Sequence, residues 1–404
     1  MAKRYTIATE SILEGCLVTP DVYEGILQRF ETFVAPFIKH LHQRTQRQKA
    51  IDYMKGLLSD VERKNVESIA YHHGTDRQPL QKFIGQVEWD DEVILDKLVK
   101  RVAREIGTQN GILILDPTSF PKKGSESVGV QRQWCGRNGK VDNCQVATFL
   151  AYVGSDEFAL VDRRLYLPKE WTDDPPRCRI AGVPEEHIIE KTRHEQSLEM
   201  LKGRGKKLPH SWIAGDDEMG RIPWFRKELR KMNKSYILAV PSNILVCDLE
   251  NTSCSCCANT FVSVHHWMKS LPADRWKLVK VRQGHKSWLS VRLATCRVRA
   301  MIEGEVGDEE TLIVSKWRDE SYKPRCDYYL SYNNGEEVSL DEYGRVIKSA
   351  YRIEECFHRG KGECGLGDYQ VRNWLGWHHH ICLSMLSQWL LTEELIHQKK
   401  MVRR

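Results

Sequence analysis

The sequence of 404 residues predicts an α/β protein built around a mixed sheet. Between residues 106 and 243, short apolar runs typical of strands occur in the order three strands, helix, strand, helix, strand. The preceding part has a helical pattern, and the following part changes to short strands between charged turns before a helical end. We therefore expect four regions: a helical region over 1–105, an α/β core over 106–243, a β-rich insertion over 244–340, and a helical completion of the core over 341–404.

Residues 20–105 carry apolar side chains at helical spacing, with basic side chains between them. Around HHGTDRQPLQKFIG, one helix is predicted to stop at Gly74, and Thr75 or Asp76 is predicted to cap the next. A helix, a tight turn and a basic helix are typical of helix-turn-helix DNA readers. A helical bundle with a solvated basic face has the same pattern. The interleaved basic residues slightly favour a domain that binds DNA ends.

The predicted strands of the core cover residues 111–116, 144–153, 158–168, 211–215 and 236–243, with helices over 184–203 and 222–233. Three consecutive strands followed by two that are separated by helices match the order of a ribonuclease-H-like core. Asp116 then ends the first strand, and Asp216 follows the fourth. Ligands and metals collect at such strand ends.

Glu354 lies far beyond these strands, in a helical segment. The interval from Asp216 to Glu354 is too long for a direct link in a compact core, so we expect the β-rich insertion between them. Lys361 follows Glu354 by two helical turns and shares its face. The alternative for this pair is a surface helix with ordinary charges.

Three carboxylates on two strand ends and a helix suit a hard divalent metal such as Mg²⁺, which takes oxygen ligands. Phosphoryl transfer on DNA requires such metals between the attacking and leaving oxygens. Taken alone, Asp116 has another interpretation, because Asp-Pro is a common turn initiator.

Composition permits a nucleic-acid partner without requiring one, since the formal net charge is only +6, from 61 basic and 55 acidic residues. The first twenty residues contain Glu10 and Glu14 and lack the apolar region of a signal peptide. No uncharged apolar run reaches the roughly 18 residues of a membrane span. These features predict a cytoplasmic protein with no membrane partner.

Thirteen cysteines, odd in number and scattered, do not suggest a disulfide framework in a chain without an export signal. Only Cys254, Cys256 and Cys257 cluster. No second cysteine pair stands at zinc-site spacing, so reduced thiols that bind no metal are favoured over a zinc site.

Several blocks of the chain resemble the DDE transposases of bacterial insertion sequences, with the insertion-sequence 701 family as the nearest branch. The first block is LDPTSFPKKGSESVGVQRQWCGRNGKVDNCQVATFLAYV. The others are YMKGLLSDVERKNVESIA, DRRLYLPKEW, GDDEMGR and IEECFHRGKGECGLGDYQVRNWLGWHHHICLSML. The resemblance covers roughly residues 45–395. It implies a ribonuclease-H-like catalytic domain with an inserted β domain, and cut-and-paste transposition.

Carried over by position, the resemblance implies that Asp116, Asp216 and Glu354 are the catalytic, metal-binding acids and that Lys361 is the family's basic residue. Asp216 keeps the family spacing to Gly220, which leaves Asp217 and Glu218 for solvent or helix capping. Only Glu354, and not Glu355, keeps the interval to Lys361. The wider clan has Tyr and Arg where this chain has Ile347 and Ala350, with Tyr351 and Arg352 nearby as substitutes.

We predict contacts with DNA for six further residues: Lys122, Lys123, Arg352, Tyr369, Arg372 and Trp374. Core packing is the favoured alternative for Trp374, and simple solvation is the alternative for the two lysines. Of the consecutive His378, His379 and His380, we expect one or two to contact DNA phosphate.

The sequence thus predicts an enzyme that cleaves DNA at the ends of a mobile element and transfers the freed strands into target DNA. It implies two Mg²⁺ ions per active site, with Mn²⁺ as a substitute. The implied partners are double-stranded DNA, as terminal inverted repeats and target, and a second copy of the chain on DNA, so that the protein associates with the nucleoid. The alternatives are a DNA-binding protein with a decayed catalytic core and a metal-dependent endonuclease without strand transfer.

Overall fold

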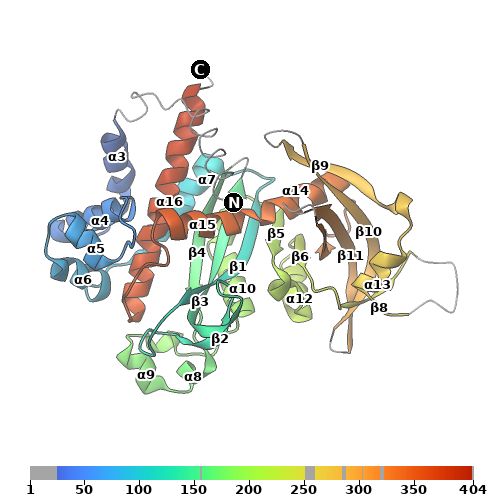
Figure 1. Cartoon of the computed structure of the whole chain (residues 1–404), viewed down its shortest axis with the longest axis horizontal. Helices are drawn as coiled ribbons and strands as arrows, with labels where there is room; N and C mark the ends of the chain where they lie inside the picture. The colour runs from blue at the N-terminus through green and yellow to red at the C-terminus, as the bar shows by residue number, and fades with distance from the viewer. Residues whose placement is uncertain are drawn as a thin grey trace.

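The computed structural model describes residues 25–154, 157–250, 260–283, 288–302, 304–318 and 323–402. Figure 1 shows a helical lobe at the left, a sheet through the middle and a β-rich lobe at the right. The predicted α/β class is therefore confirmed in its coarse form, as a mixed α/β chain with one large mixed sheet.

Five helices form the N-terminal part that the structure describes: α3 (Ile26–Ile38), α4 (Arg44–Leu57), α5 (Val66–His72), α6 (Arg77–Gly85) and α7 (Asp91–Ile106). Gly74 has a φ of 61° in the turn between α5 and α6, a left-handed conformation that glycine adopts without strain. Of the two predicted caps, Asp76 is the one used, because its side chain accepts a hydrogen bond from the backbone of Gln78.

Six strands make up the first part of the sheet: β1 (Ile112–Pro121), β2 (Gln131–Cys135), β3 (Lys140–Gly154), β4 (Glu157–Leu165), β5 (Trp212–Gly215) and β6 (Tyr236–Ala239). β3 pairs antiparallel with both β1 and β4, whereas β5 lies parallel to β1 and to β6. The spatial order is β4-β3-β1-β5-β6. β2 was not predicted, and it pairs with the first residues of the long β3.

The insertion adds six strands and one helix: β7 (Leu245–Asp248), β8 (Val262–Ser263), α13 (Val264–Ser270), β9 (Lys277–Gln283), β10 (Trp288–Ile302), β11 (Glu305–Arg318) and β12 (Pro324–Tyr332). β12 pairs antiparallel with β6, so the insertion continues the same sheet. A second apolar core lies between this part of the sheet and α13, built from residues such as Val264, Trp267 and Val298.

The remaining helices cover the sheet or complete the helical lobe. They are α8 (Lys169–Thr172), α9 (Pro175–Ile180), α10 (Arg193–Lys202), α11 (Asp217–Gly220), α12 (Pro223–Lys231), α14 (Leu340–Ala350), α15 (Arg352–Glu363) and α16 (Trp374–Val402), with short 3₁₀ turns at Glu185–His187, Gly205–Lys207 and Ala273–Arg275. The helix predicted over 184–203 begins only at Arg193, because Thr192 and Glu195 form a capping box there.

α16 joins the N-terminal helices to the sheet (Figure 1). His380 on α16 shares a hydrogen bond of 2.8 Å with the hydroxyl of Tyr53 on α4. Nearer its end, Glu393 pairs with Arg101 of α7 at 2.7 Å, and Glu394 pairs with Arg29 of α3 at 2.8 Å. The N-terminal helices therefore rest against the end of the chain.

In the described part of the chain, no helix is long and apolar enough to cross a membrane. The nine cysteines described there are all free thiols. The Cys254, Cys256 and Cys257 cluster lies outside the described residues.

Candidate active site

Two acids leave neighbouring parallel strands at the same level of the sheet. The pairing of β1 with β5 ends at Leu115 and Gly215, and the next residues are Asp116 and Asp216. The prediction that Asp116 ends its strand was wrong, because β1 continues to Pro121 through pairing with β3. Asp116 nevertheless faces the space at the end of β5, as expected for a strand that outruns its parallel neighbour.

Asp216 is the N-cap of α11, and its Oδ1 accepts a hydrogen bond of 3.1 Å from the backbone N–H of Met219. The sequence predicts a capping or solvated role for Asp217 and Glu218, whereas the structure gives the capping role to Asp216. Asp217 pairs with Arg221, and Glu218 pairs with Arg193 at 2.7 Å. Within the described residues, Asp216 is thus the one acid of the three without a basic partner.

Glu354 lies in the first turn of α15 and lines the same cavity as Asp116 and Asp216. The neighbouring Glu355 instead pairs with Arg352 at 2.6 Å and with Arg359 at 3.1 Å. Lys361, two turns later, also lines this cavity, and its Nζ donates a hydrogen bond of 2.8 Å to Thr118 Oγ1. The predicted common face of Glu354 and Lys361 is confirmed.

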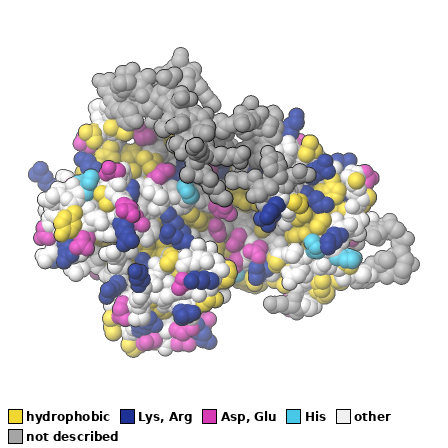
Figure 2. All heavy atoms as spheres, in the orientation of Figure 1, with side chains coloured by type: hydrophobic (Ala, Val, Ile, Leu, Met, Phe, Trp, Pro, Cys, Tyr) yellow, Lys and Arg dark blue, Asp and Glu magenta, His cyan; other side chains and the backbone are white. Residues whose placement is uncertain are grey.

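The main cavity has a volume of about 1250 Å³ and a basic rim. Besides the three acids and Lys361, it is lined by Trp134, His194 and the arginines of this rim, Arg137, Arg193 and Arg221. Asp217 and Glu218 also line it and pair with Arg221 and Arg193, so Arg137 is the arginine of the rim without an ion pair in the described part of the chain. A smaller cavity of about 400 Å³ lies on the insertion side and is lined by the same three acids. Figure 2 shows acidic side chains near the middle of the molecule, between the helical lobe and the insertion.

The electrostatics of the three acids are unfavourable without a cation. Loss of hydration, with repulsion from Asp216 and Glu354, raises the pKa of Asp116 well above its usual range. Loss of hydration and repulsion from Glu218 raise the pKa of Asp216 to about 7. Partial burial also raises the pKa of Glu354, and burial lowers the pKa of Lys361 to about 8.

The donor set fits a hard divalent cation. All three groups are carboxylates, the oxygen ligands that Mg²⁺ prefers. A positive ion among them removes the repulsion that raises the pKa of Asp116. No group of three His, Cys, Asp or Glu among the described residues is already gathered into a metal site, so the acids line the cavity without forming a closed cage.

None of the six predicted DNA contacts lines either cavity beside the acids. Lys123 and Arg372 are exposed elsewhere on the surface. Lys122 is half-buried, with its Nζ 3.5 Å from the centre of the Tyr369 ring, and burial lowers its pKa to about 7. Arg352 is held by Glu355.

Two of the six predicted contacts are aromatic side chains. Tyr369 is only 3% exposed, and its hydroxyl donates to Gln145 at 2.8 Å, so the predicted contact with DNA is wrong. Trp374 packs between His187 and His378 and lines a different cavity. The alternative of core packing describes it better than base stacking.

His379 and His380 are fully buried, which leaves the half-buried His378 for the predicted contact with DNA phosphate. The residues that do form the basic rim, Arg137, Arg193 and Arg221, were not predicted. Arg221 ends the quoted GDDEMGR block, and that adjacency was the available signal.

The positions that depart from the wider clan lie at the smaller cavity. Ile347 is buried, and it lines that cavity together with Ala350 and Tyr351. The hydroxyl of Tyr351 faces Asp327 at 3.5 Å. Tyr351 and Arg352 therefore both face carboxylates in this structure.

A mixed sheet with three converging acids under a basic rim defines an enzyme class that acts on phosphodiesters of nucleic acid. A family model described as DDE superfamily endonuclease matches residues 36–249, more than half of the chain. The chain belongs to the DDE superfamily endonuclease family, and it is a transposase of the DDE type.

Two further proteins are similar to this chain. The probable transposase for insertion sequence element IS701 of Microchaete diplosiphon is 22% identical over 321 residues, which span 79% of this chain and 75% of that protein. A cryo-EM structure of the piggyBac transposase synaptic complex with hairpin DNA aligns over 93% of this chain and 76% of that one, with a TM-score of 0.44 and 12% identity.

Proposed function

We propose that this transposase cleaves DNA at element ends and joins them to target DNA with Asp116, Asp216 and Glu354 as its catalytic acids. The observation that supports this assignment is their convergence from β1, the end of β5 and α15 on one cavity. In the described part of the chain, none of the three forms an ion pair, whereas Asp217, Glu218 and Glu355 all do.

We further propose a ribonuclease-H-like core for the catalytic half. The order β4-β3-β1-β5-β6, with three antiparallel strands followed by two parallel ones, supports it. The proposed domain division stays as the sequence suggested: 1–105 for end binding, 106–243 and 341–404 for the core, and 244–340 for the insertion.

The three acids would hold two Mg²⁺ ions, for which Mn²⁺ would substitute. When bound, such ions activate the attacking oxygen and neutralise charge on the leaving oxygen. The Asp116 side chain reaches the site from the sheet, and the Asp216 side chain is fixed by its hydrogen bond from Met219. The Oδ2 atom of Asp216 then remains for a cation.

Lys361 would hold a non-bridging oxygen of the scissile phosphate, because its Nζ lies at the cavity and is anchored by Thr118. Arg137, Arg193 and Arg221 would hold the adjoining backbone. Hydrolysis by water breaks the P–O3′ bond and leaves a 3′-hydroxyl on the element. That hydroxyl then attacks a target phosphodiester, forming a new P–O3′ bond and releasing the target's own 3′-oxygen.

The proposed substrates are double-stranded element ends and target DNA, bound by two copies of the chain. A supercoiled plasmid carrying the gene's native flanks, incubated with the purified protein and Mg²⁺, tests the proposal. Breaks mapped at both element ends, absent with Asp116→Asn, are expected. DNA binding without metal-dependent breaks would instead identify a binding protein with a decayed core, and breaks without joined products would identify an endonuclease.

A further inference from the structure

The insertion contains a strongly basic segment in a chain that is otherwise nearly balanced. Residues 260–302 contain a single acid, Asp274, and nine basic residues: Lys269, Arg275, Lys277, Lys280, Arg282, Lys286, Arg292, Arg297 and Arg299. Over the whole chain the ratio is 61 to 55. Figure 2 shows Lys and Arg side chains over the insertion, next to hydrophobic patches. Such a local concentration requires an explanation apart from net charge.

The strand register places two of these cations, Lys280 and Arg292, on one face together with Lys316 of β11. Cys326 of β12 lies opposite Lys316 of β11, Lys316 lies opposite Arg292 of β10, and Arg292 lies opposite Leu278 of β9. Directly opposed residues on neighbouring strands project to the same side of a sheet. Lys280, two residues after Leu278, shares that side. We name Lys280, Arg292 and Lys316 the basic row.

The basic row lies where the sheet extends beyond its helical cover. Further along β10, Cys296 and Val298 on the same face are buried in the core with α13. Lys280 and Arg292 are exposed, and within the described residues neither forms an ion pair or a hydrogen bond through its side chain. Leu278 between them is 66% exposed. Lys316 Nζ lies 3.7 Å from the centre of the Trp276 ring.

The other face of the same strands is built differently. Val279 and Val291 point there and are buried in the main core, which α14 covers by packing against β9. Farther along β10 on that face, Arg297 pairs with Glu309 at 3.2 Å. The opposite face also carries Lys277, which is exposed and forms no ion pair in the described part of the chain. Along β10, however, that face has Glu309 paired with Arg297 and directly opposite Arg299, whereas the cations of the basic row have no acid beside them among the described residues.

The basic row also begins at the catalytic acids. Cys326, the first residue of the cross-strand series, lines the smaller cavity together with Asp116, Asp216 and Glu354. From Cys326 the series crosses three strand spacings, roughly 14 Å, to Leu278. A polyanion that is bound at the acids and extends from them toward the insertion would therefore pass over the basic row.

We propose that the basic row binds the sugar–phosphate backbone of duplex DNA on the insertion side of the scissile bond, without reading its sequence. Unpaired Lys and Arg at cross-strand spacing suit phosphates, and Leu278 and Trp276 supply apolar contact for sugars. The inference rests on the proposed function, because the proposed catalytic site fixes where the DNA starts.

The test compares two double variants of the full chain with equal loss of charge on opposite faces of β9 and β10. Lys280→Gln with Arg292→Gln removes two cations of the basic row. Arg297→Gln with Arg299→Gln removes two cations from the other face of β10. Fluorescence anisotropy would measure binding of a labelled DNA duplex of arbitrary sequence over a series of salt concentrations, and thermal unfolding would confirm that both variants fold.

For the variant in the basic row, we expect the slope of log K against log salt to fall by about 2, since each lost phosphate contact removes about 0.9. The matched variant should keep the wild-type slope. Equal slopes for both variants would overturn the inference. The two proposals can fail separately. If the salt dependence of DNA binding falls in the basic-row variant but wild type makes no metal-dependent breaks, the proposed catalysis is refuted and the proposed DNA contact stands.

Discussion

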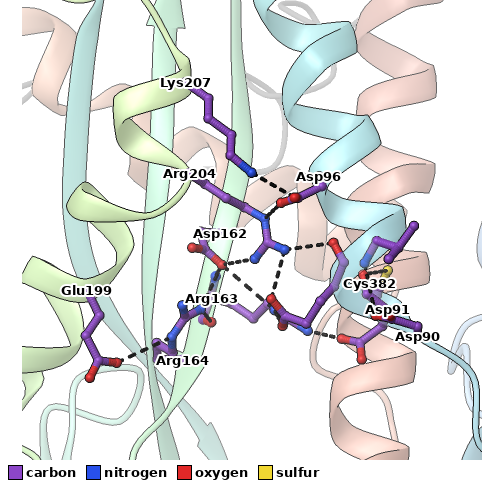
Figure 3. A network of polar contacts seen from close by, with 12 residues as sticks. Asp90, Asp91, Asp96, Asp162, Arg163, Arg164, Glu199, Arg204, Lys207 and Cys382 are labelled. Atoms are coloured by element: carbon purple, nitrogen blue, oxygen red, sulfur yellow. Dashed lines mark hydrogen bonds and ion pairs between the residues drawn. The ribbon is translucent and has the colours of Figure 1, made fainter.

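Two groups of charged side chains lie on the same sheet and are treated in opposite ways. Asp116 on β1, Phe149 on β3 and Arg163 on β4 are aligned across three strands. Around Arg163, charges are paired with opposite charges (Figure 3). Around Asp116, the nearby charges are mostly of the same sign, from Asp216, Glu354 and Glu218.

The group around Arg163 is an ion-pair network that joins α7 to the sheet. Arg163 is fully buried and pairs with Asp91 and, at 2.6 Å, with Glu92. Arg204 pairs with Asp162 at 2.8 Å and with Asp96 at 2.9 Å. Ion pairs of this kind hold secondary-structure elements together, and the loss of one partner leaves the other charge buried and uncompensated.

The group around Asp116 shows the reverse. Three acids face one cavity, and partial burial and mutual repulsion raise the pKa of Asp116. That arrangement lowers stability unless a cation is bound, which is typical of a functional site rather than of a structural one. The comparison teaches that ion pairing, more than burial or proximity, separates the proposed catalytic acids from the acids beside them in the sequence.

The largest expected effect comes from neutralising the acids one at a time. Asp116→Asn, Asp216→Asn or Glu354→Gln should each lower the rate of metal-dependent DNA cleavage by at least about 10³-fold, because each removes a proposed metal ligand. The adjacent Asp217→Asn and Glu355→Gln serve as controls, since Arg221 and Arg352 already hold those carboxylates. Single-turnover cleavage measures this, and equal losses in the controls would mean the assignment is incorrect.

Next in size is the expected effect of breaking the ion-pair network. Arg163→Met should lower the free energy of unfolding by about 3–5 kcal/mol, because the largely buried Asp91 would lose its partner. Asp116→Asn in metal-free protein should instead leave stability unchanged or raise it. Urea unfolding monitored by tryptophan fluorescence measures both. If Arg163→Met proved neutral, the network would have no structural role.

A smaller effect is expected at Lys361. Lys361→Gln should slow cleavage about 10- to 100-fold, since one charge-assisted contact to the phosphate is lost. Thr118→Val, which removes only the anchor of the Nζ group, should have a weaker effect in the same direction. Rates at saturating DNA separate this effect from binding. No change in rate would place Lys361 outside the reaction.

The smallest effect concerns pH. The pKa of Asp216 is raised to about 7 in the folded protein, so the stability contributed by its protonated form is present at low pH and is lost as pH rises through about 7. In metal-free protein, the melting temperature of wild type relative to Asp216→Asn should therefore fall as the pH rises from the ordinary pKa of 3.8 to about 7. Mg²⁺ at alkaline pH should raise the melting temperature of wild type and not that of the variant. A constant difference would mean that Asp216 has an ordinary pKa.

Local sequence patterns were sufficient to predict features that depend on neighbouring residues. The apolar runs before Asp116 and Asp216 marked the strands, and the interval from Glu354 to Lys361 gave the shared face. The choice of Asp216 and Glu354 over their acidic neighbours agrees with the ion pairs of Asp217 and Glu355, which no local pattern reveals.

Long-range packing explains what was missed. The sequence does not show that Tyr369 is buried, and it leaves open which of the consecutive histidines pack. His379 and His380 do, as the contact of His379 with the backbone oxygen of Ile84 shows. β2 is short and mostly polar, and it forms only because β3 extends far enough to pair with it. The pairing of β12 with β6 likewise depends on residues almost a hundred positions apart.

Metal binding tests most directly the central claim, that Asp116, Asp216 and Glu354 together bind the metal ions. Isothermal titration of Mn²⁺ into wild type, Asp116→Asn and Asp217→Asn separates the candidate ligand from its paired neighbour without requiring DNA. We expect wild type and Asp217→Asn to bind the ion with equal affinity, and Asp116→Asn to bind it far more weakly. Undiminished binding by Asp116→Asn would contradict the claim.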